Sequence, residues 1–203
     1  AGWLANGKLV HYPIRNDVDG EGRQLVNWLW EIETPQYKRW DWNRVAKVED
    51  FIAGAESWRF DWLDVPAFLR AAELVLEYPM VDKDPLPAWS FGRVTLLGDA
   101  AHPMVPRGSN GAGQAILDAR ALAQCVHQAK DLKEYESQRL APTAKIVLEN
   151  RRNPPDAILR EVYQRTGDKP FARIEDVISA EELAALSNRY KQIAGYDRET
   201  LRR

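Results

Sequence analysis

The chain has 203 residues, of which 45% are hydrophobic and 29% charged, and its formal net charge is −2. This length and composition are typical of a soluble globular protein with one large domain or two small ones. Because the basic residues are spread along a slightly acidic chain, we expect no nucleic-acid surface. No apolar run comes near the roughly 18 residues that a membrane span needs.

Cysteine and histidine are rare, which limits the metal and redox chemistry that the chain can support. Cys125 is the only cysteine, and His11, His102 and His127 lie far apart. An internal disulfide and a cysteine-based zinc site are therefore excluded, and the spacing of the histidines predicts no metal site. The first twelve residues lack the charged and apolar parts of a signal peptide. We therefore expect a protein of the reducing cytoplasm.

The first part of the chain is predicted to be antiparallel β-structure. Residues 8–14 and 24–33 are rich in β-branched and aromatic side chains, and a polar turn joins them. One face of the second strand is wholly apolar and is predicted to be buried: Val26, Trp28, Trp30 and Ile32. Six of the eight tryptophans lie in the first 60 residues. They either pack a core and a lid or form an aromatic wall around a flat ligand.

Two helices are predicted after this β-rich part. Residues 43–55 have apolar side chains at nearly helical spacing. Residues 64–75 also suit a helix, with Asp64 as its N-cap and Pro66 in its first turn. The end of this second helix is ambiguous, because the residues from 74 onward also suit a strand.

A short strand and a longer helix are predicted in the middle of the chain. Residues 93–97 indicate a buried strand that ends at Gly98, and residues 110–127 indicate a helix. An apolar stripe runs along this helix at steps of three and four residues: Ala112, Ala115, Ile116, Ala119, Leu122, Ala123 and Val126. Since most of the stripe is alanine, we expect the helix to approach its neighbour closely through this face.

The rest of the chain is predicted to be helical. A long polar helix covers residues 131–152, and Pro142 is expected to kink or break it. Residues 154–167 predict another helix. The last helix begins with a capping box of Ser179 and Glu182. These elements together predict a mixed α+β or α/β fold.

The junction between the strand at 93–97 and the helix at 110–127 has the features of a ligand site. Gly98 permits a tight turn, and Asp99 lies just beyond the strand's carboxyl end, where it can accept hydrogen bonds from ribose or ribityl hydroxyls. Asn110 can N-cap the helix, whose first amides favour negative charge. A purely structural strand–turn–helix also explains the glycines of this segment.

The stretch GRVTLLGDAAHPMVPRGSNGAGQAILDARALA closely resembles the second FAD-binding motif of the single-component flavoprotein aromatic hydroxylases. This family includes the para-hydroxybenzoate hydroxylase, salicylate hydroxylase and phenazine-carboxylate monooxygenase groups. The stretches LVHYPIR and QLVNWLWE resemble its substrate-domain strands, and YKQIAGYD resembles the C-terminal helix of its salicylate-hydroxylase-like branch. The resemblance covers nearly the whole chain.

The resemblance implies part of a two-domain FAD-binding monooxygenase fold. Residues 1–90 would be a substrate-binding, β-rich region, residues 91–130 the second FAD-binding motif, and residues 131–203 a helical region. The family's first glycine-rich motif and its middle Asp-Gly motif are not found in this sequence. The glycines at 108–113 are not the first motif, because they follow a loop and not a strand. The chain therefore resembles the C-terminal half of a longer protein.

The resemblance also implies roles for individual residues. Asp99 would bind the ribityl chain of FAD, Pro106 would lie beside the flavin ring near the place where oxygen reacts, and amides at the helix start would face the pyrimidine end of the ring. The predicted cofactor-binding residues are Asp99, Pro106, Gly108, Asn110, Gly111, Ala112 and Gly113.

Catalytic and substrate-binding roles are less narrowly defined. His102 either orients the loop or takes part in catalysis, and Pro106 is a second catalytic candidate. Four residues are candidates for substrate binding: His11, Tyr12, Trp28 and Arg107. For His11 and Tyr12 the alternative is core or surface packing. Arg107 either meets an anionic substrate or NAD(P)H, or is simply exposed to solvent.

The activity that the resemblance implies is hydroxylation of an aromatic substrate. NAD(P)H would reduce FAD, and dioxygen would then form a flavin hydroperoxide that delivers oxygen to an electron-rich ring. The implied partners are a small aromatic substrate, O2 and the N-terminal half of the same protein, and a homodimer is compatible with them. Two other hypotheses stay open: a catalytically silent binding or assembly fragment, and a flavin reductase or oxidase without oxygen insertion.

Overall fold

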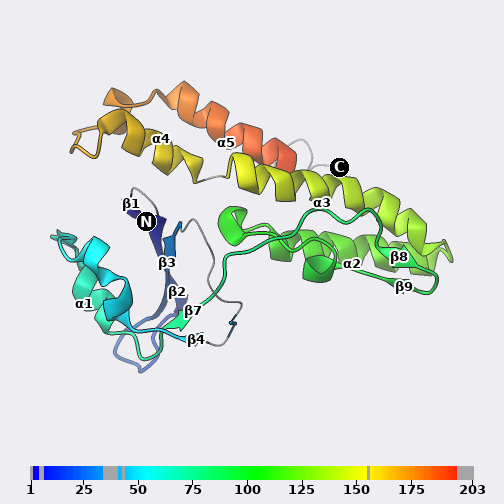
Figure 1. The fold of residues 1–203 in the computed structure, drawn as a ribbon, viewed down its shortest axis with the longest axis horizontal. Coiled ribbons are helices and arrows are strands. Elements are labelled where there is room, and N and C mark those ends of the chain that lie inside the picture. The colour runs from blue at the N-terminus through cyan, green and yellow to red at the C-terminus, as the bar shows by residue number, and fades with distance from the viewer. Residues whose placement is uncertain (1, 5–6, 34–40, 43, 155, 196–203) are drawn as a thin grey trace. The chain divides into compact units, whose positions relative to one another are not determined.

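The computed structural model describes residues 2–4, 7–33, 41–42, 44–154 and 156–195 (Figure 1). The chain forms two compact units, Ala1–Pro79 and Met80–Arg203. The three-part division at residues 90 and 130 stays a prediction. Among the described helices, none is both long enough and apolar enough to cross a membrane.

The first unit is built on a three-stranded antiparallel sheet. Its strands are β1 (Gly2–Leu4), β2 (Gly7–Arg15) and β3 (Leu25–Ile32), with β2 in the centre. The two predicted strands are confirmed, and β1 is an additional one. A side chain at Gly7 would overlap the carbonyl oxygen of Glu31 on β3, so the close approach of these strands requires glycine at that position.

The core of the first unit lies on one face of this sheet. Its fully buried members are Leu9, Val48, Ile52, Ala55, Val65 and Leu69. Trp28 and Trp30 are partly buried and pack against this core, as the alternation along β3 predicts. Ile32 was predicted to share their burial, but 45% of it is exposed because it is the last residue of the strand.

The predicted helix at 43–55 is wrong. The structure instead has a short strand, β4 (Arg44–Val45), and two 3₁₀ turns, η1 (Val48–Asp50) and η2 (Ile52–Ala55). The backbone of β4 pairs with β7 (Leu76–Glu77), and this pairing leaves too short a segment for an α-helix.

The predicted helix that begins at Asp64 is confirmed, although it is shorter than expected. Helix α1 (Val65–Arg70) has Asp64 as its N-cap, and the carboxylate accepts a hydrogen bond of 2.9 Å from the amide of Ala67. A small hairpin of β5 (Arg59–Phe60) and β6 (Leu63–Asp64) leads into the helix.

The second unit begins with a small hairpin in place of the predicted buried strand. Strands β8 (Ser90–Phe91) and β9 (Val94–Thr95) pair only two residues each. Val94 is 63% exposed and Leu97 is 40% exposed, so the prediction of burial is wrong for this chain. The apolar sequence is that of a buried strand, but in the described part of the chain β9 pairs only with β8.

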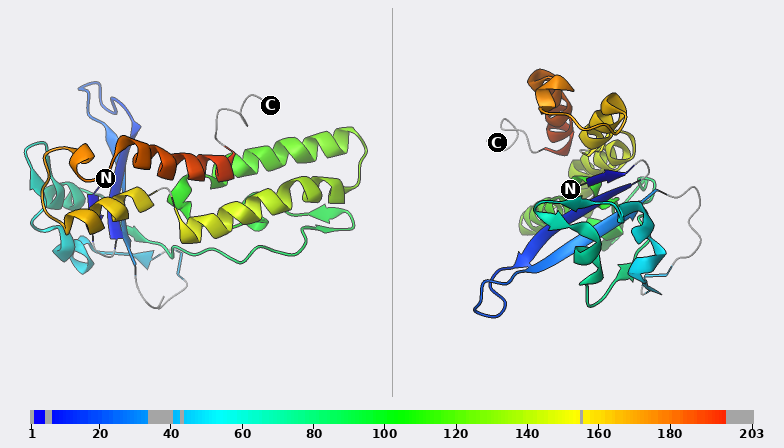
Figure 2. Two further views of the ribbon diagram at one scale, coloured as in Figure 1. Left: turned by 90° about the horizontal axis from the view of Figure 1, so that it is seen from above. Right: turned by 90° about the vertical axis from the view of Figure 1, so that its left-hand side faces the viewer.

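Helices form the remainder of the second unit, close to their predicted ranges. They are α2 (Gly111–His127), α3 (Leu132–Arg152), α4 (Ala157–Thr166), the turn η5 (Ile174–Asp176) and α5 (Ala180–Ala194). Figure 2 shows α2 and α3 as a long helical hairpin. Helix α3 continues through Pro142, so a break there is wrong. The Ser179–Glu182 capping box is confirmed.

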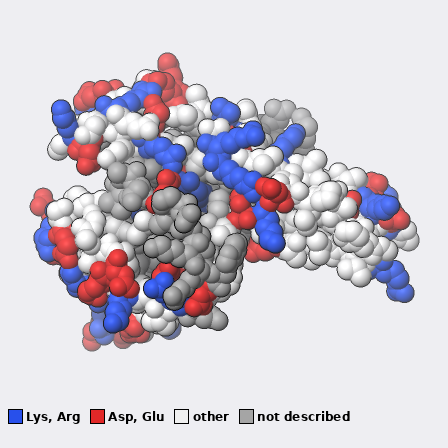
Figure 3. Space-filling model, in the orientation of Figure 1, with Lys and Arg blue, Asp and Glu red and all other residues white. Residues whose placement is uncertain are grey.

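The residues that α2 buries fully are not those of the predicted apolar stripe, of which only Ala115 and Leu122 are even partly buried. Its buried residues are Gln114, Asp118, Ala121 and Cys125. In the predicted stripe, Ile116 is 69% exposed and Val126 is 65% exposed. Figure 3 shows few charged side chains on the visible surface of the end of this unit formed by α2, α3 and the β8–β9 hairpin.

Candidate functional site

A tight turn at Gly98 carries Asp99 at the start of the candidate site. The turn is η3 (Gly98–Ala100), in which Gly98 has a left-handed backbone with φ of +58°. The carbonyl of Gly98 accepts hydrogen bonds of 2.9 Å from the amides of Ala101 and His102. A Cβ at Gly98 would lie 3.3 Å from the Cβ of Ala115 on α2. Gly98 is thus favoured both by its conformation and by close packing.

The carboxylate of Asp118 on α2 fixes this turn through contacts to Gly98 and His102. It is fully buried and accepts a bond of 3.0 Å from the Gly98 amide, while His102 Nε2 lies 2.6 Å from the same oxygen, Oδ2. The other oxygen, Oδ1, accepts a bond of 2.7 Å from Arg139 Nε on α3. Arg139 also donates to the side chain of Gln114 at 2.6 Å. We call Gln114, Asp118, Arg139 and His102 the buried polar cluster.

The buried polar cluster keeps Asp118 ionised. Burial by itself raises the pKa of the Asp118 carboxyl, but hydrogen bonds from His102, Arg139 and the Gly98 amide together lower the pKa below its ordinary value. The carboxylate therefore joins three segments that are distant in sequence: the turn at Gly98, α2 and α3. The sequence reasoning missed Asp118, Gln114 and Arg139. The spacing of Gln114 and Asp118, four residues apart and off the alanine stripe, is the signal that would have indicated a shared helix face.

His102 lies behind the turn. It is only 3% exposed, and its ring packs 5.6 Å from the ring of Trp89 between centroids. This position, together with its contact to Asp118, favours the role of orienting the turn over a direct catalytic role. Both roles remain predictions.

Asp99 and the first turn of α2 lie next to each other. The first backbone hydrogen bond of the helix runs from the Gln114 amide to the Asn110 carbonyl, at 2.9 Å. The amides of Gly111, Ala112 and Gly113 therefore have no carbonyl partner within the helix. Asp99 is exposed, and its Oδ1 lies 3.8 Å from the position that a Cβ on Gly111 would take. The carboxylate of Asp99, an acceptor, thus lies beside the amide donors of the first turn of α2.

The loop between these two elements contains η4 (Pro106–Gly108). Pro106 is exposed. Asn110 precedes α2 as expected, but its side chain does not cap the helix. Its Nδ2 instead donates to the hydroxyl of Tyr190 on α5, so the predicted side-chain cap is wrong. The hydrogen bond to Tyr190 uses Nδ2, and Oδ1, the atom that would form a side-chain cap, accepts no bond from the first amides of α2.

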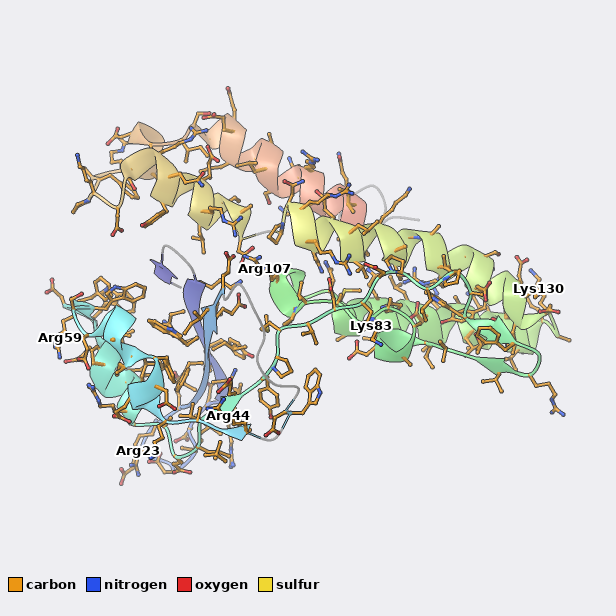
Figure 4. The ribbon with its side chains drawn as sticks, in the orientation of Figure 1. Arg23, Arg44, Arg59, Lys83, Arg107 and Lys130 are labelled. Atoms are coloured by element: carbon orange, nitrogen blue, oxygen red, sulfur yellow. The ribbon has the colours of Figure 1, made fainter. Side chains whose placement is uncertain are left out.

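Arg107 lies on this loop and is labelled in Figure 4. Its Nε is 3.2 Å from the carboxylate of Asp156, the residue before α4, and its side chain is 18% exposed. The ion pair ties the loop to α4. The predicted contact of Arg107 with an anionic substrate or NAD(P)H stays a prediction.

The three substrate-binding candidates of the first unit fall on two faces of the sheet. His11 and Trp28 are directly opposite each other in the β2–β3 register. His11 meets Phe68 edge-on at 5.6 Å, and Trp28 lies 5.9 Å from Phe51, so both face the core. Tyr12 is on the other face, 45% exposed, where its hydroxyl accepts a bond of 3.0 Å from Asn27. The structure brings His11 and Trp28 together and separates Tyr12 from them.

Comparison with known proteins finds a family model and several relatives that match this chain. The family model described as "FAD binding domain" matches residues 81–150, which contain the turn, the loop and α2. The chain is 38% identical over 193 residues to the phenazine 1,6-dicarboxylic acid hydroxylase PhzS of Lysobacter antibioticus, covering 92% of this chain and 45% of that protein. Over nearly its whole length the chain is thus similar to part of an aromatic hydroxylase, and its residues 81–150 match an FAD-binding domain.

Further relatives support the same assignment. The 3-hydroxybenzoate 6-hydroxylase of Polaromonas naphthalenivorans (strain CJ2) is 31% identical over 157 residues, covering 73% of this chain and 36% of that protein. A solved salicylate hydroxylase substrate complex matches 95% of this chain and 45% of its own with a TM-score of 0.60 and 26% identity. The chain thus has part of the fold of an FAD monooxygenase, and it spans less than half the length of these relatives.

Proposed function

We propose that this chain forms one side of the FAD site of an aromatic monooxygenase. The observation that carries the proposal is the position of Asp99 beside the first amides of α2, within the residues that match the FAD-binding family. A carboxylate suits the hydroxyls of a ribityl chain, and unpaired helix amides suit a group that carries or develops negative charge.

The residues present fit this cofactor. Asp99 is exposed and lies in the middle of a turn that Asp118 fixes. Gly111 and Gly113 carry no side chain above the first turn of α2, so a flat ring can approach the backbone there. FAD, when bound, supplies the redox chemistry and the activation of dioxygen. The chain's own residues bind the ribityl hydroxyls, orient the ring against the helix end and exclude water from its edge.

The proposed reaction uses NAD(P)H and O2 and hydroxylates a small aromatic substrate. The support is that relatives of this chain are named as hydroxylases of phenazine 1,6-dicarboxylic acid and 3-hydroxybenzoate. In the first unit, His11 and Trp28 share one face of the sheet with other aromatic rings, which suits a flat substrate. A cytoplasmic location is part of the proposal, and the single cysteine, Cys125, is consistent with it.

The proposed cofactor site needs a second side. The exposed apolar residues of α2, which include Ile116 and Val126, form a surface that we call the outer face, and Phe91 and Val94 of the β8–β9 hairpin are exposed as well. Exposed apolar surfaces of this kind mark contacts with other protein. We propose that the outer face packs against the part of the protein that corresponds to the remainder of its longer relatives. A homodimer stays a second prediction.

Flavin binding by the full-length protein tests the proposal directly. The purified protein is expected to show the absorbance of bound FAD, and Asp99→Asn is expected to weaken FAD binding about tenfold or more, since a charged hydrogen-bond acceptor is lost. Asp168→Asn, at an exposed aspartate after α4, is the matched control and should leave affinity unchanged. A full-length protein that takes up no FAD would contradict the proposal and favour a silent binding fragment.

Oxygen transfer separates a monooxygenase from a flavin reductase or oxidase. An aromatic substrate is expected to stimulate NAD(P)H consumption, and isotopically labelled dioxygen should leave one labelled atom in the aromatic product. NAD(P)H consumption that yields only hydrogen peroxide with every aromatic tested would favour the reductase or oxidase.

A further inference from the structure

Helix α5, the last of the described helices, contacts the loop of the proposed flavin site through the hydroxyl of Tyr190. Tyr190 of α5 is 7% exposed, and its hydroxyl accepts a hydrogen bond from Asn110 Nδ2. The same hydroxyl donates a bond of 2.6 Å to Asn150 Oδ1 on α3. Tyr190 lies outside residues 81–150, which match the FAD-binding family model.

This hydroxyl holds the loop at both of its ends. Asn110 lies two residues after η4 and is the N-cap residue of α2. Asn150 Nδ2 donates a bond of 3.3 Å to the carbonyl of Val105, the residue before η4. The chain of bonds from Val105 through Asn150 and Tyr190 to Asn110 therefore spans Pro106–Gly108, the segment expected beside the flavin ring.

Close packing against Tyr190, and not only room for a ligand, requires glycine at position 108. A Cβ at Gly108 would overlap the hydroxyl of Tyr190 and also approach the Asn110 side chain. The glycine in the middle of the loop is thus required because the tyrosine hydroxyl occupies the space that a side chain would need. The loop and α5 are fitted together at the atom that makes the hydrogen bonds.

We propose that Tyr190 is a positioning residue for the flavin loop, acting through Asn110 and Asn150. This inference rests on the proposed FAD site and adds the C-terminal helix to it. Asn110 is 1% exposed and Asn150 is fully buried, so loss of the hydroxyl leaves polar atoms of both without their partner and without access to water. The loop then loses its fixed geometry at Val105 and Asn110, and the amides at the start of α2 lose theirs.

The test is Tyr190→Phe in the full-length protein, with Tyr135→Phe as the matched control. Tyr135 is also fully buried, and its hydroxyl makes one bond of 3.0 Å, to the carbonyl of Leu96. Tyr190→Phe is expected to weaken FAD binding about tenfold in a fluorescence titration, and Tyr135→Phe less than about twofold. Amide hydrogen exchange of residues 105–113 is expected to speed up about tenfold or more only in Tyr190→Phe.

A double-mutant cycle identifies the route of the effect. If Tyr190 acts through Asn110, then Asn110→Ala combined with Tyr190→Phe weakens FAD binding no more than the stronger single substitution does. Additive losses, or equal effects of Tyr190→Phe and Tyr135→Phe on FAD binding, would overturn the inference. Hydrogen exchange tests the positioning role of Tyr190 without any bound flavin. A wild-type protein that binds no FAD contradicts the proposed function, while unchanged exchange at 105–113 in Tyr190→Phe contradicts the role of Tyr190.

Discussion

Helix α2 buries polar side chains on one face and exposes apolar side chains on another, whereas an ordinary surface helix does the reverse. The inner face buries Gln114 and Asp118, which are 2% and 0% exposed. The outer face exposes Ile116 and Val126, together with several alanines. In most amphipathic helices the apolar face is covered and the polar face is solvated.

The inner face makes its contacts within this chain, while the contact of the outer face is the one proposed above. The polar atoms of the inner face are satisfied within this chain by Arg139, His102 and the Gly98 amide. The inner face therefore fixes the turn that carries Asp99. The outer face has the composition of a core, and the proposed second side of the cofactor site would cover it. The following predictions test this contrast.

The largest effect is expected from Asp118→Asn. This substitution keeps the size of the side chain but removes the charge that pairs with Arg139, whose side chain is only 12% exposed. Because an unpaired buried cation is costly, the free energy of unfolding of the full-length protein should fall by about 3 kcal/mol, measured by urea denaturation. Asp168→Asn, at an exposed position, should stay within about 0.5 kcal/mol of wild type. If Asp118→Asn lowers the free energy of unfolding no more than Asp168→Asn does, the inner face is not the structural support of the turn.

A smaller effect is expected on the outer face. In the full-length protein, Ile116→Ser should lower the free energy of unfolding by about 2 kcal/mol if another part of the protein covers this residue. Ile14→Ser is the control, because Ile14 is a comparably exposed isoleucine at the end of β2 and should change stability by less than about 0.5 kcal/mol. If Ile116→Ser has no more effect than the control, the outer face is solvated and the proposed packing is wrong.

The smallest effect is expected in the pH dependence of the stability that ionised Asp118 contributes on the inner face. The pKa of Asp118 is lowered in the folded state from its ordinary value of 3.8. Its ionised form therefore adds stability that is fully present above 3.8 and is lost as the pH falls through the lower, folded pKa. The stability difference between wild type and Asp118→Asn should be largest near about pH 7 and should shrink in acid. A difference that grows in acid would contradict the ionised state of Asp118.

Local signals predicted the capped helices well. Asp64 before α1, and Ser179 with Glu182 at the start of α5, act as the sequence indicates, because a cap depends on residues only three positions apart. The pairing of β2 with β3 also follows from local alternation and a turn. The order of residues along the chain, together with the family resemblance, predicts that Asp99 and the glycines at the start of α2 are site residues, and these roles stay predictions.

Contacts between distant segments escaped prediction. The helix expected at 43–55 was wrong because β7, more than 30 residues later, pairs with β4. The side-chain cap expected from Asn110 was wrong, because its side chain is held by Tyr190 through Nδ2 and its Oδ1 accepts no bond from a helix amide. In both cases a partner far along the chain competes for a backbone or side-chain group, and no local pattern contains that partner.

The amino-acid sequence carries the resemblance to aromatic hydroxylases. It also predicts the turn and the helix at the candidate site and the positions of most described helices, because these depend on residues that are close together in the chain. The tertiary structure alone decided which face of α2 is buried and which residues hold the turn and the loop. The reason is that burial of a polar side chain depends on its partners, and Asp118, Arg139, Asn150 and Tyr190 meet only when three helices pack together.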